Sequence, residues 1–263
     1  MNDPEEFARE SFGLSFERGG PHLARTMMLG DLRMLLDERG LDASSSQLLA
    51  AVEEGNLLGK PSAQARKLAA RHLAKLYMLD PSVPLYRAFT FLWRRETEGR
   101  PLLALLVAYA RDAVLRSSAP FILPMQEGER FERTQLEAFL DEMEPGRFSA
   151  ATLKSAAQNI AGTWTQSGHL RGRTKKIRVR VTPTPASVSL SLLLGHVAGL
   201  RGELTFESDY VKLLDCRPGL GIELAETAAA KGWIRFMRIG SVIELAFPRL
   251  LSTSEPESLR EQG

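Results

Sequence analysis

Two apolar, strand-like runs near the end of the chain constrain its fold more than any other feature. They cover residues 233–239 and 242–247 and are joined by Gly240 and Ser241, a pair suited to the two-residue turn of a type II′ β-hairpin. A hairpin closed by this turn has one register, which gathers the large apolar side chains on one face and leaves a cation near the tip. The expected pairs are Ile234 with Phe247, Phe236 with Leu245, and Arg238 with Ile243.

Three helical patterns precede this hairpin. They cover about residues 187–200, 208–214 and 220–231, with a turn at 217–219 before the third and Gly232 as its C-terminal cap. The order of helix, helix, turn, helix and hairpin is that of a winged helix-turn-helix. We therefore predict a winged helix-turn-helix-like C-terminal part.

The first 145 residues show helical periodicity interrupted by glycine and proline, and no convincing strand. Ser62 is placed to cap one helix, Pro84 opens another, and a third, apolar on nearly all sides, runs from about Leu102 to Ser117. The expected fold class is mainly α with small β-hairpins. We expect a helical N-terminal domain over 1–145, a basic helix and strand segment plus the winged-helix-like module over 146–251, and a disordered tail over 252–263.

Positive and negative charges are unevenly distributed along the chain, although the net charge is only +2. No acidic residue occurs between Glu144 and Glu203, whereas the same stretch holds nine lysines and arginines. Like charges repel in a compact state, so a segment with this excess is usually balanced from outside it. Nucleic acid, an acidic lipid surface and the acidic half of this protein itself each fit that requirement.

Six of these nine cations fall within ten residues and are the first candidates for contact with DNA phosphates. Residues 176–181 alternate strictly between cation and aliphatic, which predicts a strand with Ile177, Val179 and Val181 on its inner face and its cations facing outward. Outward cations can displace the counterions of nucleic acid, although a solvated strand edge protected by charge is the alternative. The six candidates are Arg171, Arg173, Lys175, Lys176, Arg178 and Arg180.

Two further groups of cations are candidates with weaker support. Lys67, Arg71 and Lys75 share the polar face of the helix that follows Ser62, where a charged outer face is the default. Arg235 and Arg238 lie on the predicted hairpin, and they are better placed for DNA than the third helix of the module. That helix contains Glu223, Glu226 and Lys231, and its net negative charge disfavours entry into a groove.

No pattern for catalysis, metal binding or cofactor binding emerges. The only cysteine, Cys216, cannot form an intramolecular disulfide, and the four histidines stand at ligand spacing from neither one another nor a carboxylate. The N-terminus is acidic where an export signal needs positive charge, and no apolar stretch approaches the roughly 20 residues that cross a bilayer. We therefore expect a non-enzymatic, cytoplasmic protein with no catalytic residue, no metal, no cofactor and no membrane segment.

Four segments spread over the chain share helix starts and apolar patterns with a known family. They are residues 14–20 (LSFERGG), 56–66 (NLLGKPSAQAR), 148–154 (FSAATLK) and 162–170 (GTWTQSGHL), followed by the winged-helix-like run. Together they resemble BrxA, the small accessory component of bacterial BREX phage-exclusion systems. The resemblance implies a helical N-terminal domain, winged-helix-like parts and binding of double-stranded DNA with little sequence preference. It also implies work beside other BREX proteins, which carry the ATPase, methyltransferase and phosphatase-like chemistry, and it transfers no catalytic residue.

The leading hypothesis is thus a DNA-binding accessory protein, with two alternatives from other classes. A winged-helix transcriptional regulator would need a base-reading helix, which the acidic third helix opposes. A protein-protein adaptor would use the winged helix as a docking face, and the cations of 171–180 would then meet an acidic partner. At the level of sequence, DNA and an acidic partner explain these cations equally well.

Overall fold

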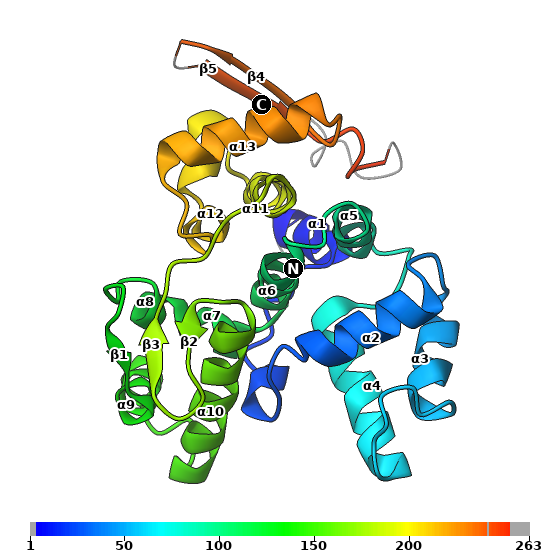
Figure 1. Ribbon diagram of the computed structural model, residues 1–263, viewed down its shortest axis with the longest axis vertical. Helices are drawn as coiled ribbons and strands as arrows, with labels where there is room; N and C mark the ends of the chain where they lie inside the picture. The colour runs from blue at the N-terminus through cyan, green and yellow to red at the C-terminus, as the bar shows by residue number, and fades with distance from the viewer. Residues whose placement is uncertain (1–3, 241, 253–263) are drawn as a thin grey trace. The chain divides into compact units, whose positions relative to one another are not determined.

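Helices dominate the protein, and its strands form two small antiparallel sheets (Figure 1). The computed structural model describes residues 4–240 and 242–252. The α-helices are α1 (Pro4–Phe12), α2 (Leu29–Arg39), α3 (Ser45–Glu53), α4 (Ala63–Tyr77), α5 (Pro84–Trp93), α6 (Arg100–Arg111), α7 (Ala113–Arg116), α8 (Ala119–Ile122), α9 (Arg133–Met143), α10 (Ala150–Gln166), α11 (Pro185–Val197), α12 (Asp209–Lys212) and α13 (Pro218–Ala230). Two 3-10 helices are η1 (Pro21–Leu23) and η2 (Gly202–Glu207), and the strands are β1 (Arg130–Phe131), β2 (Leu170–Arg171), β3 (Lys176–Arg178), β4 (Arg235–Ile239) and β5 (Val242–Ala246). The predicted fold class, mainly α with small β elements, is confirmed at this level.

The chain divides into two units, each assembled from separated segments. Unit 1 comprises residues 1–15, 82–106 and 181–263, and unit 2 comprises 16–81 and 107–180. This division differs from the boundary expected near residue 145. The reason lies in α11, which is buried along its whole length and packs against α5 as well as against α12 and α13. An apolar helix of this kind needs partners on every side, and it recruits one from the middle of the sequence.

Local sequence signals place the helices of unit 2. The Ser62 hydroxyl accepts a hydrogen bond from the Ala65 N–H (3.2 Å) and caps α4, as predicted. The predicted single helix over 102–117 is instead two helices, α6 and α7. Asp112 separates them, because its carboxylate accepts from the N–H groups of Val114 and Leu115 and so caps α7.

A three-stranded sheet in unit 2 has the order β1-β3-β2, with β3 antiparallel to both neighbours. Arg130 of β1 lies opposite Ile177 of β3, and Leu170 of β2 lies opposite Arg178. The sheet packs near α10, which contacts β2, α9 and η1. Strand β1 corrects the expectation that the first 145 residues hold no strand; with two residues it is too short to show periodicity.

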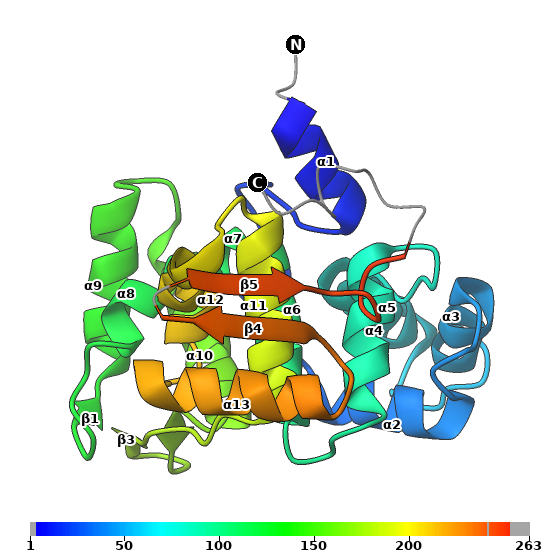
Figure 2. The same ribbon diagram turned by 90° about the horizontal axis from the view of Figure 1, so that it is seen from above.

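In unit 1, α13 lies beside the two-stranded sheet of β4 and β5 (Figure 2). The register predicted from the Gly240 turn is confirmed where both strands are described, since Phe236 pairs with Leu245 and Arg238 with Ile243. Gly240 has φ +63°, a left-handed conformation that glycine adopts without a steric penalty. The predicted turn type also depends on Ser241, and the predicted tail covers 253–263; these residues lie outside the described part.

No helix among the described residues combines the length and the apolar character needed to cross a membrane.

Candidate nucleic-acid interface

The six cations predicted to contact DNA from residues 171–180 do not share one environment. Strands β2 and β3 form a hairpin, and its tip consists of Arg171, at the end of β2, and the four residues between the strands. Arg171, Arg173, Lys175 and Arg180 are exposed, Lys176 is half-buried, and Arg178 is fully buried with 0% of its surface exposed. The hairpin therefore presents part of the predicted cation group and encloses the rest.

Arg178 corrects the predicted orientation of the strand. Its Nε donates to the Ile122 carbonyl (3.2 Å), and its Nη1 donates to the carbonyls of Val179 and His169. Ile177 and Val179, expected on the inner face, are half-buried. Strand β3 is shorter than the predicted strand over 176–181, and the prediction that its cations face outward is wrong for Arg178. The guanidinium fork has enough donors to satisfy several buried carbonyls at once, which an aliphatic side chain cannot do.

Lys176 has a second structural role in the same hairpin. Its ammonium group donates to Thr165 Oγ1 (2.7 Å) and to the Gly172 carbonyl (3.2 Å). Burial lowers the pKa of Lys176 from its ordinary value. These bonds connect the tip of the hairpin to α10 and leave Lys176 poorly placed to reach a DNA phosphate.

The hairpin tip itself carries three exposed cations on a tight turn. Gly172 has φ +121°, and a Cβ atom there would lie 2.0 Å from the Lys175 carbonyl oxygen, so only glycine fits. Arg171, Arg173 and Lys175 form no ion pair with an acid anywhere in the described part of the chain. Their charges are available to a partner.

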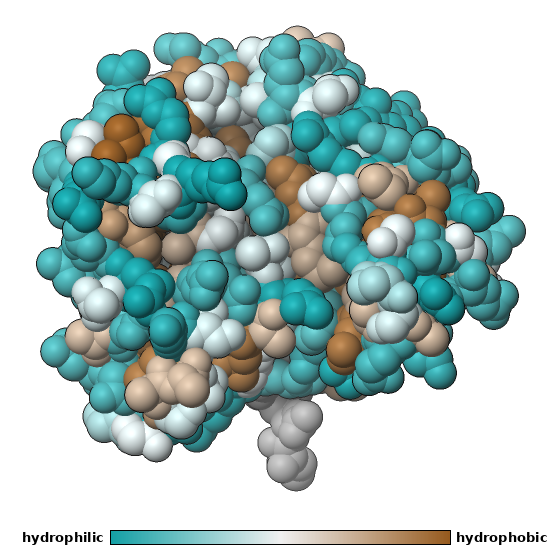
Figure 3. All heavy atoms as spheres, turned by 60° about the horizontal axis from the view of Figure 1, so that its bottom comes forward, coloured by the Kyte–Doolittle hydropathy of each residue, from teal (hydrophilic) through white to brown (hydrophobic). Residues whose placement is uncertain are grey.

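The candidate cations of α4 are all exposed on one side of that helix. Lys67, Arg71 and Lys75 recur every four residues, which brings them to one helical face at steps of about 6 Å. Lys75 is paired with Glu17 across 2.6 Å, whereas Lys67 and Arg71 have no ion pair within the described residues. Figure 3 brings the lower side of Figure 1 forward and shows mainly hydrophilic residues, with hydrophobic ones in separate areas.

The β4–β5 hairpin of unit 1 exposes Arg235 and Arg238, the last two candidates. Arg238 donates from Nε to the Gly240 carbonyl (3.2 Å) near the tip. The outer face of the hairpin combines Arg235 with Glu244 and with three exposed apolar side chains: Met237 (50%), Ile239 (77%) and Val242 (69%). This hairpin is thus less strongly cationic than the β2–β3 tip.

A buried chain of polar side chains in unit 2 escaped prediction. His22 Nδ1 lies 2.7 Å from Asp112 Oδ2, and His22 Nε2 lies 2.8 Å from Thr163 Oγ1. All three side chains are fully buried. Burial alone would raise the pKa of Asp112, but hydrogen bonds and the charge interaction with His22, together with backbone N–H groups, outweigh it and lower that pKa.

The hydrogen-bonded order of threonine, histidine and aspartate resembles that of a nucleophilic triad. In this protein, however, the threonine and the aspartate also accept hydrogen bonds from backbone N–H groups. Thr163 Oγ1 accepts from the Met27 N–H (2.8 Å), and Asp112 Oδ2 also accepts from the His22 N–H (2.9 Å). With no exposed surface, Thr163 offers no path to a substrate atom. A Cβ at Gly20 would lie 2.0 Å from Asp112 Oδ1, so the glycine permits the close approach of this segment.

Other side chains of α10 form further hydrogen bonds, both to residues 26–29 and to Ser118. Gln166 accepts from the Leu29 N–H (3.0 Å) and donates to Thr26 Oγ1 (3.0 Å), while Trp164 donates to Ser118 Oγ (2.9 Å). Segment 162–170, one of the four that carry the family resemblance, is therefore a structural centre of unit 2. The signal that could have revealed it is Asp112 itself, the only acid between Glu98 and Glu127 and surrounded by apolar residues.

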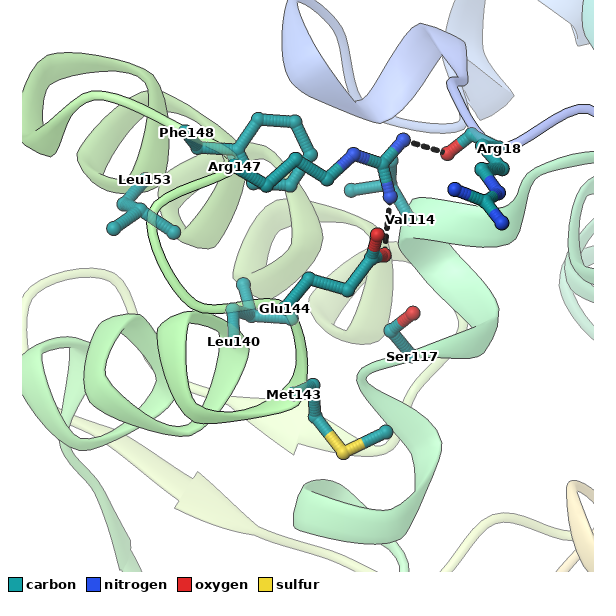
Figure 4. Close-up of a pocket in the computed structure, with 10 residues that line it drawn as sticks. Arg18, Val114, Ser117, Leu140, Met143, Glu144, Arg147, Phe148 and Leu153 are labelled. Atoms are coloured by element: carbon teal, nitrogen blue, oxygen red, sulfur yellow. Dashed lines mark hydrogen bonds and ion pairs between the residues drawn. The ribbon is translucent and has the colours of Figure 1, made fainter.

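A small hollow in unit 2 is lined by residues of α7, α9, α10 and the 144–148 turn (Figure 4). Arg147 crosses it, bonding to Glu144 and to the Arg18 carbonyl and stacking on the Phe148 ring at 4.7 Å. Its charged group is thereby engaged, and the remaining walls are mostly aliphatic. Within the described residues no group of three or more His, Cys, Asp or Glu side chains could hold a metal ion.

Comparison with known proteins adds no relative: no family model matches the chain, and no curated protein matches it.

Proposed function

We propose that this chain is a non-enzymatic, cytoplasmic protein that binds double-stranded DNA with little sequence preference and serves a bacterial BREX-type phage-defence system. The observation that supports DNA binding most is the β2–β3 tip, where Arg171, Arg173 and Lys175 are exposed and without acidic partners. Each such cation can neutralise a phosphate and release condensed counterions, an interaction independent of base sequence.

The C-terminal elements of unit 1 support a winged-helix-like interpretation through their order: α11, α12, α13, then β4 and β5. In this interpretation α13 is the helix that would enter a groove, yet it exposes Glu223 and Glu226. These carboxylates repel the DNA backbone. Contact through Arg235 and Arg238 of the hairpin is the better arrangement, which favours backbone binding over a sequence-specific transcriptional regulator.

The assignment to phage defence rests on the resemblance to BrxA. The segments that carry it include structurally central residues, such as Ser62 at the start of α4 and the Thr163 and Trp164 hydrogen bonds of α10. The partners proposed on this basis are other BREX proteins, which supply the catalysis.

One observation favours a second function, that of a protein-protein adaptor. Met237, Ile239 and Val242 expose apolar surface on one face of the β4–β5 hairpin, whereas phosphate contact requires none. In that case the cations of the β2–β3 tip meet an acidic protein.

Fluorescence anisotropy with duplexes of random sequence, at several salt concentrations, tests the proposal. With four to six phosphate contacts, the logarithm of the binding constant falls against the logarithm of salt concentration with a slope of about −4 to −5. The triple variant Arg171→Gln, Arg173→Gln, Lys175→Gln is expected to reduce that slope by about 2.7. A matched triple variant at exposed cations outside the candidate groups, Arg18→Gln, Arg39→Gln, Lys154→Gln, is expected to reduce it much less.

Absence of binding at about 50 mM salt, or equal slopes for the two triple variants, would overturn DNA binding through the β2–β3 tip.

A further inference from the structure

A cluster of cations surrounds His72 on the surface of unit 2. Helix α4 carries Arg71, His72 and Lys75 within little more than one turn, and Arg71 and Lys75 stand four residues apart on the exposed face. Lys67 continues this face a further turn away from His72. The helix alone thus gathers two cations beside one imidazole.

Arg25 joins this cluster because its short segment is fixed against α4 at both ends. On one side, η1 packs against α4, and the Arg25 N–H donates to the Pro21 carbonyl of η1 (2.8 Å). On the other side, the Tyr77 hydroxyl at the end of α4 donates to the Met27 carbonyl (2.6 Å). Arg25 is therefore held beside α4, and its charge acts on His72.

The positive charge of the cluster is only partly balanced. Arg25 donates one hydrogen bond, to the Ala24 carbonyl (3.3 Å), and neither Arg25 nor Arg71 forms an ion pair within residues 4–240 and 242–252. Glu17, the acid beside Lys75, is already bonded to that lysine. Arg111, whose Nε donates to the Lys75 carbonyl (2.8 Å), adds a further cation on that side.

His72 is half-buried and has no hydrogen-bond partner in the described structure. Burial, and then the charges of Arg25, Arg71 and Lys75, lower the pKa of His72 from its ordinary value. The imidazole is accordingly neutral near pH 7, with a ring N–H that needs an acceptor. An anion at this position would accept that hydrogen bond and neutralise the two unpaired guanidinium groups.

We infer that Arg25, Arg71 and His72 form a binding site for a phosphate-type anion, with Lys75 at its edge, and that His72 takes up a proton when the anion binds. The charge of the anion stabilises the imidazolium form, so by linkage the anion binds more tightly as the pH falls. A free oxyanion and a phosphodiester of the DNA backbone share this chemistry. Where the ligand is DNA the inference deepens the proposed function, but the site for a free anion does not depend on DNA binding.

NMR pH titration of the full chain tests the inference, with sulfate as the probe and chloride at equal ionic strength as the reference. Assignment of the His72 ring signal is straightforward, because His72→Gln removes it and the other three histidines are buried. Sulfate is expected to raise the pKa of His72, and each full unit of that rise corresponds to a tenfold gain in sulfate affinity at low pH. Arg71→Gln or Arg25→Gln is expected to abolish the sulfate effect, whereas Lys67→Gln leaves it in place.

A second arm of the experiment replaces sulfate with a short duplex. If sulfate and the duplex both raise the pKa of His72, the site takes an anion and contributes to DNA binding. If sulfate alone does so, the ligand is a free oxyanion, and this result stands even where the anisotropy experiment shows no DNA binding. An unchanged His72 titration in sulfate, or an equal sulfate effect in Arg71→Gln, overturns the inference.

Discussion

The two hairpins of this protein differ in the side chains that they bury and in those that they expose. In the β2–β3 hairpin a cation, Arg178, is buried beside Leu170, and the exposed tip is cationic and polar. In the β4–β5 hairpin the buried side chain is aliphatic, Leu245, and the exposed surface mixes cations with apolar residues. The first hairpin thus combines a buried leucine with hydrogen bonds from a buried guanidinium, whereas the second relies on apolar packing.

This difference shows what strand alternation does and does not specify. A period of two separates the residues of a strand into two faces, and the core decides which face is inner. In the β4–β5 hairpin the inner face follows from the large apolar residues. In β3 the Arg178 guanidinium bonds to the carbonyls of Ile122, His169 and Val179, and this one cation is buried. Lys176 and Arg180, two positions away on either side, are half-buried and exposed.

The largest effect is expected from removing the buried cation. Arg178→Ala removes three hydrogen bonds, leaves the Val179 carbonyl without its guanidinium donor and opens a cavity, so the free energy of unfolding should fall by about 3 kcal/mol or more. Arg173→Ala, at the exposed tip of the same hairpin, should change it by less than about 0.5 kcal/mol. Thermal and urea denaturation followed by circular dichroism measures both; equal stabilities would show that Arg178 is not an anchor.

Removing the apolar anchor of the second hairpin should have a somewhat smaller effect. Leu245→Ala is expected to cost about 2 to 3 kcal/mol, toward the low end for a buried leucine because a two-stranded sheet can adjust around the cavity. Val242→Ala on the exposed face is the control and should lie within about 0.5 kcal/mol of the parent. The same denaturation measurements apply, and a larger loss from Val242→Ala would reverse the assigned faces.

The two hairpin tips should also differ in their contribution to DNA binding. Arg173→Gln is expected to reduce the salt slope of duplex binding by about 1, because the tip presents this cation without an acidic neighbour. Arg238→Gln should reduce it less, since its guanidinium already bonds to the Gly240 carbonyl. Anisotropy at several salt concentrations compares the two, and a larger effect of Arg238→Gln would move the main contact to unit 1.

The smallest effect on stability is expected from the exposed ion pair between Lys75 and Glu17, in contrast to the buried Arg178. A hydrogen bond and the charge of Lys75 lower the pKa of Glu17, so its stabilisation is present above the unfolded-state pKa of about 4.3 and is lost as the pH falls through the folded-state value. Because the pair is solvent-screened, Glu17→Gln should cost less than about 0.5 kcal/mol at pH 7 and nothing at pH 2. Denaturation at both pH values checks this, and a cost that persists at pH 2 would exclude the ion pair as its cause.

Features that depend on neighbouring residues were predictable from the sequence. The Ser62 cap, the helix opened by Pro84 and the register set by Gly240 each arise from groups within a few positions of one another. The exposure of Arg173 and Lys175 also follows from their place on a short glycine-containing loop. These are the parts of the fold and of the candidate interface that needed no tertiary information.

Features that depend on distant residues were not predictable. His22 meets Asp112 across 90 positions and Thr163 across 141, so no local spacing reveals the cluster. Arg178 bonds to the Ile122 carbonyl 56 positions away, and this contact places inside a cation that was predicted to face outward. Likewise α5 packs against α11 although the two helices lie far apart in the sequence. The division between the units therefore differs from the boundary expected near residue 145.

The discontinuous arrangement of the units has a consequence for the order in which they form during synthesis. Unit 2 has all its residues once Arg180 has left the ribosome, and its folding requires residues 82–106 to stay outside it as a long insertion. Unit 1, in contrast, begins with the first helix made but lacks its central helix, α11, until residues after Val181 emerge. The apolar helix α5 therefore lacks its partner α11 while more than half of unit 2 is translated, and this nascent segment is where a chaperone would be needed first.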